Sequence, residues 1–522
     1  YPHPKSCIYK LNSRCILMDS STRVVVNTGI QYVRTVVQVA IMLYTSRVVL
    51  DNLGVEDYGI YNLVGGVIAM LSFIQINLAN TTIRYLSYHH GKNDMPMVIK
   101  IFNNSLCIQL FFGLVICVLL VCATDFVFAN MLNISMERLS VAKVVYYLMI
   151  GSLFFNLVST PYFASLISHE NLVYSSMVQI VDSILKVPIV VSLIYVTFDK
   201  LIWYSCGSLF LVIFNFILYY IYCRKKYEEC RHFNFRTFEY SLFKEMFSFM
   251  GWNVYGTCCI VGRGQGVAIL LNNFYSAAIN AAYGIGNQVA GQLNFLSNAL
   301  TTAINPQIIK AEGAGDRQKM FRLAEISCKF SFLLMSMISV PAFIFMDKLL
   351  AIWLREVPDY TTMFCRMFLL AIQIDLLTMN MAVANQAVGN VKVYSICINT
   401  IKILTLPIVY IILKMGYSAE MVMLVYVLFE SICAVGRILF LHININLSIM
   451  QYLRNVCFGG IPVFILNALI CFYISRYFIN WLFLLIFLSA VQTLFFAFLF
   501  GLREDEKSII KKIFIKLKNN ER

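Results

Sequence analysis

Polar side chains interrupt the first long apolar stretch, 25–49, at intervals of three or four residues. This spacing places them on one face of a helix. An arginine at the centre of a bilayer costs roughly 2.5–3.5 kcal/mol on insertion scales, so it faces protein or water instead of lipid. We therefore expect this face to line a water-filled cavity that suits an anionic, sugar-rich ligand, in preference to a purely structural pairing. The polar residues of the face are Asn27, Gln31, Arg34 and Gln38.

A second intramembrane arginine, Arg263, lies in the apolar stretch 246–271 at a position related to that of Arg34. Glycines on both sides of it either loosen this helix or let another helix pack closely. Arg84, at the inner end of the second expected helix, is a further cavity candidate, although its side chain can instead extend to the membrane surface. The expected helix 277–305 adds amide groups to the same cavity: Asn287, Gln288 and Gln292.

Carboxylates are rare in the apolar stretches, and each is a candidate to bind the proton or sodium ion that drives transport. They are Asp182, Asp375 and Glu430. The alternative is that each acid pairs with a lysine, as Asp182 would with Lys186 one turn along the helix. We predict no metal site and no cofactor, since no CxxC or cysteine–histidine spacing typical of zinc occurs. No HExxH, GxSxG or GxxxxGK[ST] motif occurs either, so the sequence does not indicate an enzyme.

The composition is that of a membrane protein. Hydrophobic residues make up 60% of the 522 residues and charged residues 13%, whereas about 25% of a soluble domain is charged. The formal charge of +14 is typical of basic cytoplasmic loops, and no basic, aromatic face indicates nucleic-acid binding. We expect an all-α polytopic membrane protein with about 14 transmembrane helices, each long enough to cross the hydrocarbon core. The expected helices lie at 25–49, 58–83, 98–123, 141–167, 173–197, 201–223, 246–271, 277–305, 322–346, 361–386, 393–414, 419–441, 455–475 and 479–501.

Two segments of the chain repeat each other. The segment 58–62, Tyr-Gly-Ile-Tyr-Asn, recurs at 283–287 as Tyr-Gly-Ile-Gly-Asn, an offset of 225 residues (283 − 58). The segment 39–43 recurs just before it at 267–271, Asn80 corresponds to Asn305, and 173–175 followed by 185–189 recurs as 393–395 followed by 404–408. These four matches occur in one order, so the first six expected helices correspond to the next six, and the last two are an addition. A membrane protein built from two similar halves is typical of a transporter whose substrate site lies where the halves meet.

Lysine and arginine gather in the loops that are cytoplasmic if the N-terminus lies inside. This bias predicts an even number of spans, both termini in the cytoplasm and two parallel six-helix repeats. The sequence does not begin with Met, and we expect residues 1–17 to be disordered or an artefact of the gene start. The expected segments are an N-terminal cytoplasmic segment 1–23, an N-terminal six-helix lobe 24–223, a cytoplasmic linker 224–245, a C-terminal six-helix lobe 246–442, an extra helix pair 453–501 and a basic cytoplasmic tail 502–522.

With these features the chain resembles the polysaccharide flippases (Wzx-like) of the MOP exporter superfamily. The resemblance implies a multi-pass protein of the bacterial inner membrane. It would move undecaprenyl-diphosphate-linked sugar repeats outward by alternating access, during assembly of O-antigen lipopolysaccharide, capsule or exopolysaccharide. Arg34 and Arg263 are then candidates to contact the diphosphate. The residues that carry the resemblance are the loop 53–62, Pro161, the segment 168–171, Tyr174, Lys186, the segment 283–285 and Asn305-Pro306.

The resemblance also implies partners. They are the polyprenyl-diphosphate-linked glycan, membrane lipids, a coupling H+ or Na+ and a polysaccharide polymerase or export machinery, with no nucleic acid. One alternative is a multidrug or small-molecule cation antiporter of the same superfamily, which would place a carboxylate in the first-half cavity, where this chain has Arg34. A second alternative is a membrane glycosyltransferase or polymerase, which would need a long outer loop, and the expected outer loops are short.

Overall fold

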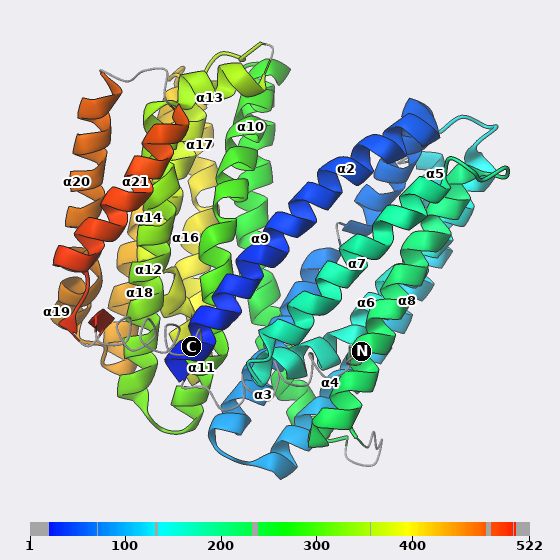
Figure 1. Cartoon of the computed structure of the whole chain (residues 1–522), viewed down its shortest axis with the longest axis horizontal. Helices are drawn as coiled ribbons and strands as arrows, with labels where there is room; N and C mark the ends of the chain where they lie inside the picture. Colours follow the sequence, from blue (N-terminus) through cyan, green and yellow to red (C-terminus); the bar gives the residue numbers. More distant parts are fainter. Residues whose placement is uncertain are drawn as a thin grey trace, which may run out of the picture. The chain divides into compact units, whose positions relative to one another are not determined.

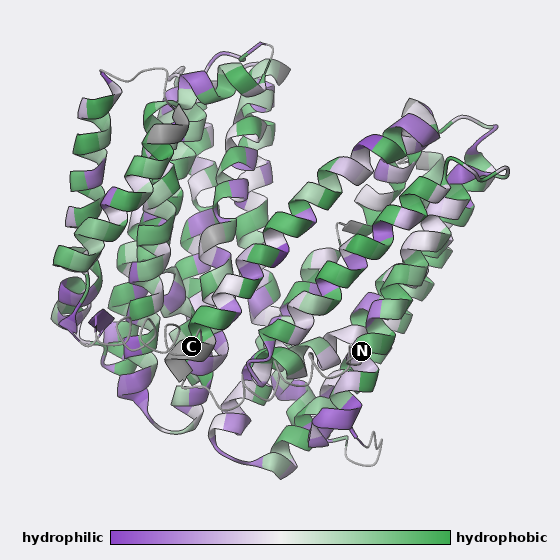
Figure 2. Cartoon of the chain, in the orientation of Figure 1, coloured by the Kyte–Doolittle hydropathy of each residue, from purple (hydrophilic) through white to green (hydrophobic). Residues whose placement is uncertain are grey.

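The computed structural model describes residues 20–69, 71–130, 134–231, 238–354, 356–476, 482–504 and 506–507. Within these ranges the regular secondary structure is helical throughout, as the apolar runs predict (Figure 1). Hydrophobic residues dominate the helices, with hydrophilic positions interspersed along them (Figure 2). The expected N-terminal segment as far as residue 19 and the tail from residue 508 onward lie outside the described residues.

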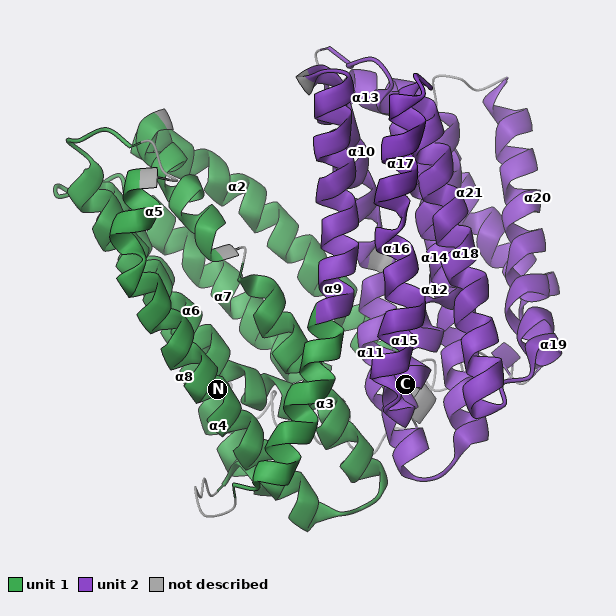
Figure 3. Cartoon of the chain, turned by 180° about the vertical axis from the view of Figure 1, so that it is seen from behind, with its two compact units in different colours: residues 1–19, 25–254 green, residues 20–24, 255–522 purple. Residues whose placement is uncertain are grey.

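The chain divides into two compact units (Figure 3). The N-terminal unit contains Val25–Val254, and the C-terminal unit contains Tyr255–Arg522 together with Ser20–Val24. The division falls within a single long helix, α9 (Tyr240–Phe274), which begins inside the expected linker.

The N-terminal unit consists of α2 (Ser20–Ala69) from Val25 onward, α3 (Ser72–Gly91), α4 (Met95–Cys122), α5 (Thr124–Asn130), α6 (Leu139–Ser168), α7 (Leu172–Ser192), α8 (Lys200–Lys226), the 3-10 turn η1 (Glu228–Cys230) and the first part of α9. Helix α6 is central, since it packs against α3, α4, α7 and α8. Its residues Val145 and Tyr146 share a buried core with Val64 of α2. Helix α2 bends at Gly54, whose φ of 79° lies in the left-handed region that favours glycine.

Arg138, the residue before α6, connects α6 to α2 and to the start of α8. Its guanidinium donates to Asp199 at 2.7 Å and to Asp57 of α2 at 2.8 Å. The hydrogen bond to Asp57 raises the pKa of Arg138 above its usual value, so the guanidinium stays charged. Asp199 also accepts from the backbone N–H groups of Leu201 and Ile202 and thereby caps α8.

The C-terminal unit consists of the rest of α9, α10 (Ala277–Leu293), α11 (Phe295–Gly313), α12 (Arg317–Ile344), α13 (Met346–Trp353), α14 (Thr361–Val388), α15 (Val391–Tyr394), the π-helical η3 (Ser395–Asn399), α16 (Thr400–Ile403), α17 (Thr405–Lys414), α18 (Ala419–Ile445), α19 (Ile449–Tyr452), the π-helical η4 (Leu453–Cys457), α20 (Phe458–Ser475), α21 (Leu482–Phe496) and the π-helical η5 (Ala497–Gly501). Helix α14 is central and packs against α10, α11, α12 and α18, while α20 and α21 pack against α12. Lys329 of α12 is buried and donates to Glu506 at 2.5 Å, so an ion pair joins the chain after η5 to this unit.

Glycines around Arg263 let neighbouring helices approach α9 closely. A Cβ on Gly266 would lie 2.6 Å from a methyl carbon of Leu406 in α17, and one on Gly262 would lie 3.0 Å from Ile403 in α16. Helix α9 continues through these glycines. Of the two roles expected for them, close helix packing is therefore the one observed.

Eleven helices of the described ranges are long and apolar enough to cross a membrane, and a twelfth span results if the bent pair Glu56–Ile68 and Ser72–Gly91 counts as one. A polytopic helical fold is confirmed, but the count of fourteen is not. The expected helix 277–305 is interrupted at Asn294, between α10 and α11. The expected helix 479–501 begins outside the described residues, and its described part contains only a shorter apolar helix, Leu485–Gly501.

Candidate functional site

Five polar residues from three helices of the N-terminal unit form what we call the N-terminal polar cluster. Helix α2 contributes Arg34, α7 contributes Gln179 and Asp182, and α8 contributes Asn215 and Tyr219. Arg34 Nη1 donates to Gln179 Oε1 at 3.0 Å, and Tyr219 hydrogen-bonds the same amide. Asn215 Nδ2 donates to Asp182 Oδ1 at 2.7 Å. The cluster thus brings together the predicted Arg34 and Asp182, whereas Gln179, Asn215 and Tyr219 were not predicted.

Arg34 carries a positive charge that no described carboxylate neutralises. Its only hydrogen bond within the described residues is to the neutral Gln179, and its Nε is buried without a partner. The side chain is half-buried, so part of the guanidinium remains accessible. A cation in a low-dielectric setting is costly unless an anion or water compensates it. The residue is therefore suited to contact an anionic ligand.

The other predicted residues of α2 differ in exposure. Asn27 and Gln31 are 1% and 2% exposed, and Asn27 Nδ2 donates to the backbone oxygen of Glu170 at 2.9 Å. These two amides therefore pack inside the unit, and the expected cavity face does not continue to them. Gln38 is half-buried, like Arg34.

Arg84 is buried within the N-terminal unit rather than extended to a surface. It is 8% exposed, and its guanidinium lies over the rings of Tyr85, Tyr88 and Phe249 at 4.6, 5.0 and 5.2 Å. Aromatic faces stabilise a cation that has been removed from water. Aromatic rings from the end of α3 and from the first part of α9 thus surround the guanidinium of Arg84.

The C-terminal unit buries a set of charges that we call the C-terminal ion network: Arg263, Asp375, Lys402, Glu430 and Arg437. Glu430 accepts a hydrogen bond from Arg263 Nη1 at 2.6 Å and another from Lys402 Nζ at 2.7 Å. Arg437 Nη1 lies 2.6 Å from Asp375 Oδ1, which is also 3.6 Å from Lys402. These residues come from α9, α14, α16 and α18, so the network joins four helices.

In this network three of the predicted charged residues, Arg263, Asp375 and Glu430, form ion pairs within the unit. Arg263 is 3% exposed, its charge is paired with Glu430, and its guanidinium lies 4.0 Å from the ring of Tyr426. Asp375 and Glu430 are each paired with cations. Three cations and two anions leave a formal charge of +1 in the network. The pairing expected as the alternative is thus present for the two acids, and Arg263 does not face an open cavity in this unit.

Asp182 differs from the other two acids. It accepts a hydrogen bond from Asn215 and forms no ion pair with Lys186 among the described contacts. A half-buried carboxylate held by a neutral amide is able to take up a proton or a small cation.

Helix α10 presents an exposed polar face. Its predicted amides Asn287, Gln288 and Gln292 are all exposed on the C-terminal unit, and Gly284 and Gly291 lie on the same side. A face in contact with lipid would be apolar, because unpaired amides are costly in hydrocarbon. This face is therefore suited to water or to a ligand with many hydroxyl groups.

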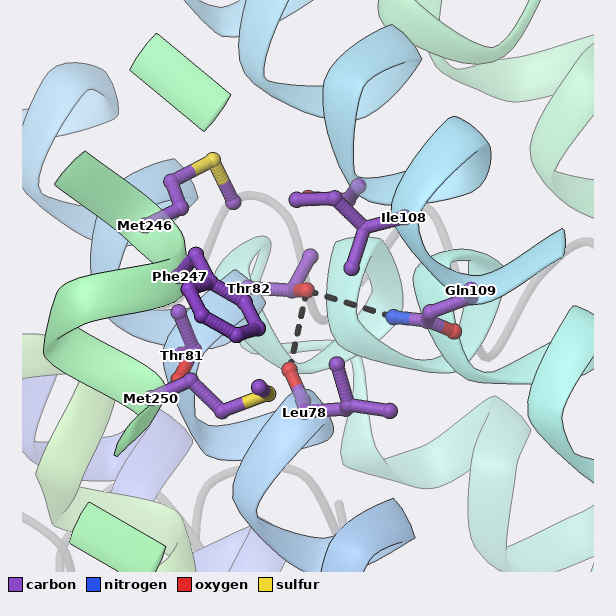
Figure 4. Close-up of a pocket in the computed structure, with 9 residues that line it drawn as sticks. Leu78, Thr81, Thr82, Ile108, Gln109, Met246, Phe247 and Met250 are labelled. Atoms are coloured by element: carbon purple, nitrogen blue, oxygen red, sulfur yellow. Dashed lines mark hydrogen bonds between the residues drawn. The ribbon is translucent and has the colours of Figure 1, made fainter. Parts of the chain in front are cut away.

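A small cavity in the N-terminal unit contains none of the predicted site residues (Figure 4). Its polar lining includes Gln109, whose Nε2 donates to Thr82 Oγ1 at 3.4 Å, and Thr82 in turn donates to the backbone oxygen of Leu78 at 3.0 Å. The volume is about 10 Å³, which is roughly the space for one water molecule. It is too small for a transported ligand.

The fold and these intramembrane polar groups define a polytopic membrane protein with the architecture of MOP-superfamily transporters. Solved structures of a MATE transporter in the bent conformation and of an outward-facing multidrug resistance MATE family transporter match with TM-scores of 0.71 and 0.70, each at 13% identity. A MOP superfamily transporter from Pyrococcus furiosus matches with a TM-score of 0.65 at 12% identity. All three alignments cover 82% of this chain and 96% of the other. At these identities the likeness shows the fold.

The sequence identifies the family. Residues 22–312, more than half of the chain, match the family model of polysaccharide biosynthesis proteins, and the chain belongs to this family. No curated protein sequence matches this chain. The family confirms the resemblance that the sequence motifs indicate.

Proposed function

We propose that the protein is a flippase that moves an undecaprenyl-diphosphate-linked oligosaccharide across the bacterial inner membrane for surface polysaccharide assembly. The observation that carries the proposal is the unneutralised guanidinium of Arg34 in a membrane helix. A diphosphate is the group of this substrate that such a charge binds best, since guanidinium–phosphate hydrogen bonds are charge-assisted. Membership of the polysaccharide biosynthesis family supports a glycan as the cargo.

The proposed mechanism assigns separate roles to the two polar regions. Arg34 binds the diphosphate, while the polyprenyl chain stays in lipid. The exposed amides of α10 offer hydrogen bonds to sugar hydroxyl groups. The Arg34 site of the N-terminal unit is exposed alternately to the two sides of the membrane. A negative-inside potential favours outward movement of an anion by roughly 2.3 kcal/mol per charge per 100 mV.

A second candidate function is export of small organic cations, and Asp182 is the observation that favours it. This half-buried carboxylate has no cationic partner among the described residues. It lies in the same cluster as Arg34, whose positive charge opposes cation binding there. A role of Asp182 in proton or sodium coupling agrees with both functions, so export assays must separate them. The binding pocket of the Pyrococcus furiosus transporter is described as having reverse polarity, which suggests a different function for that protein.

The test uses a strain of the native host from which the gene has been deleted. Surface polymer and lipid-linked precursor are measured after return of the wild type, Arg34→Ala, Arg34→Lys or Arg47→Ala. Arg47 is the matched control, because it lies on the same helix with its side chain 85% exposed. A hydrogen bond to a charged group contributes about 1.5–3 kcal/mol, so we expect Arg34→Ala to lower export by about 10–100-fold, with a milder effect of Arg34→Lys.

The controls are protein abundance and cation efflux. Normal export by Arg34→Ala at wild-type abundance would remove the assignment of Arg34. Normal polymer in the deletion strain, together with cation efflux from vesicles that depends on Asp182, would replace the flippase with the cation exporter.

A further inference from the structure

Two histidines and a glutamate from three separate elements of the N-terminal unit converge at one point. His90 lies near the end of α3, His169 follows the last residue of α6, and Glu229 lies in η1 after α8. One ligand atom from each residue lies within 4.8 Å of the other two. None of the three residues belongs to the N-terminal polar cluster.

The distances among these atoms suit a transition metal. Glu229 Oε1 lies 2.8 Å from His169 Nε2 and 3.8 Å from His90 Nε2. Ligand atoms bound to tetrahedral zinc at about 2.0–2.2 Å lie about 3.3 Å apart. The two measured distances lie on either side of this value, and the ligand nitrogens of His90 and His169 lie within 4.8 Å of each other, so movements of up to about 1 Å at the side-chain ends place all three atoms on one ion.

The cluster has acceptor atoms that the protein itself leaves unused. Glu229 is 1% exposed, and its Oε2 is buried without a hydrogen-bond partner. His90 Nε2 is also buried without a partner, since 3.8 Å is too long for a hydrogen bond. An ion pair between His169 and Glu229 explains only one of these contacts. A bound cation explains the arrangement of all three residues, because buried polar atoms are costly unless they are satisfied.

Supporting contacts hold the ligands in place, as in established metal sites. Ser165 Oγ donates to Glu229 Oε1 at 2.6 Å, and the ring of His169 stacks on Tyr227 at 4.0 Å.

We propose that His90, His169 and Glu229 bind a zinc ion, which cross-links the ends of α3 and α6 to the segment that follows α8. Two imidazoles and one carboxylate are a donor set that zinc accepts, with a fourth position left for water. The side chain of His169 is 29% exposed, which gives the ion a path to the site. The site is independent of the proposed transport function.

The test is zinc binding by the purified full-length chain, prepared with an affinity tag that contains no histidine. After chelation and addition of zinc, the bound metal is counted by mass spectrometry, and the Kd is measured by competition with a fluorescent chelator. We expect one zinc per chain for the wild type. Loss of a supporting hydrogen bond typically weakens metal binding by ~10–100-fold, so His90→Gln and His169→Gln should each weaken it by at least ~100-fold.

The matched control is His89→Gln, which changes the neighbouring histidine of α3 that lies outside the cluster. This variant should bind zinc like the wild type. Zinc should also raise the Tm of the wild type and of His89→Gln, but not of His90→Gln or His169→Gln. A wild type without stoichiometric zinc, or unchanged Kd in both cluster variants, would overturn the proposal. Two separate cluster variants keep the test decisive if one of them does not fold.

Discussion

Neutralising Glu430 should destabilise the C-terminal unit more than removing its partner Arg263. Glu430→Gln leaves three cations facing Asp375 alone, a formal charge of +2, whereas Arg263→Met leaves two cations and two anions, a formal charge of 0. The side chains of Arg263 and Glu430 are each 4% exposed, so solvent screens neither change. The number of lost contacts alone would not predict this order.

The magnitudes follow from what remains after each substitution. Removing one partner of a buried ion pair costs roughly 3–5 kcal/mol, because the other charge is left unpaired. We expect this range for Glu430→Gln. After Arg263→Met, Glu430 keeps Lys402 at 2.7 Å. The main losses are then hydrogen bonds and the contact with Tyr426, for which about 1–3 kcal/mol is expected.

The assay is equilibrium unfolding of the purified protein in mixed detergent micelles. The double variant Arg263→Met/Glu430→Gln returns the formal charge of the network to +1 and should be less destabilised than the sum of the single variants. Arg366→Met, which breaks a more exposed pair with Asp347, is the control and should cost at most ~1 kcal/mol. If Arg263→Met is as destabilising as Glu430→Gln, the charge argument fails.

Three further predictions concern separate parts of the molecule. Asp182→Asn keeps a hydrogen-bonding group beside α8 but removes the charge, so export in vesicles should lose its dependence on an imposed proton or sodium gradient; unchanged dependence would exclude this residue from coupling. Arg138→Ala should lower the free energy of unfolding by about 1–2 kcal/mol, since it breaks two ion pairs, whereas Arg47→Ala at an exposed pair should change it by less than ~0.5 kcal/mol. Gly266→Ala should destabilise by about 1–3 kcal/mol through overpacking, and Gly264→Ala, with no atom within 4 Å of its Cβ, should be neutral or stabilising; equal Tm values for the two glycine variants would contradict the packing in α9.

The sequence was sufficient to predict the helical membrane fold and two members of the N-terminal polar cluster. Arg34 and Asp182 are visible because a charge in an apolar stretch is unusual. Their partners are not visible, because Gln179 lies 145 residues from Arg34 and is an ordinary amide. The helical spacing does relate Gln179 to the predicted Asp182, since Gln179 precedes Asp182 by three residues and so lies on the same helix face.

The repeat predicts which positions correspond but not what they pair with. Asp182 lies between the matched segments 173–175 and 185–189, and Lys402 lies between their counterparts 393–395 and 404–408. The same stretch of the repeat therefore carries charges of opposite sign in the two units. Lys402 is buried and forms ion pairs with Asp375 and Glu430, whereas Asp182 is half-buried and accepts a hydrogen bond from the neutral Asn215. This difference depends on packing within each unit, which the repeat does not encode.

The proposed zinc ligands also could not be predicted from the sequence, because the fold alone brings them together. His90, His169 and Glu229 are separated by 79 and 60 residues (169 − 90 and 229 − 169), so no short motif relates them. They meet because α3 and α8 both pack on α6, and η1 follows α8 directly. The prediction of no metal site rested on spacing rules for closely spaced ligands, and those rules do not apply to ligands assembled by helix ends.

Reconstituted flipping is the measurement that tests the central claim most directly. Lipid-linked precursor extracted from the deletion strain is incorporated with the purified protein into vesicles, and its access to an added pyrophosphatase is followed over time. The account predicts that the wild type and Arg47→Ala expose the inner-leaflet precursor, and that Arg34→Ala does so about 10–100-fold more slowly. Equal exposure in vesicles with and without the wild-type protein would contradict it.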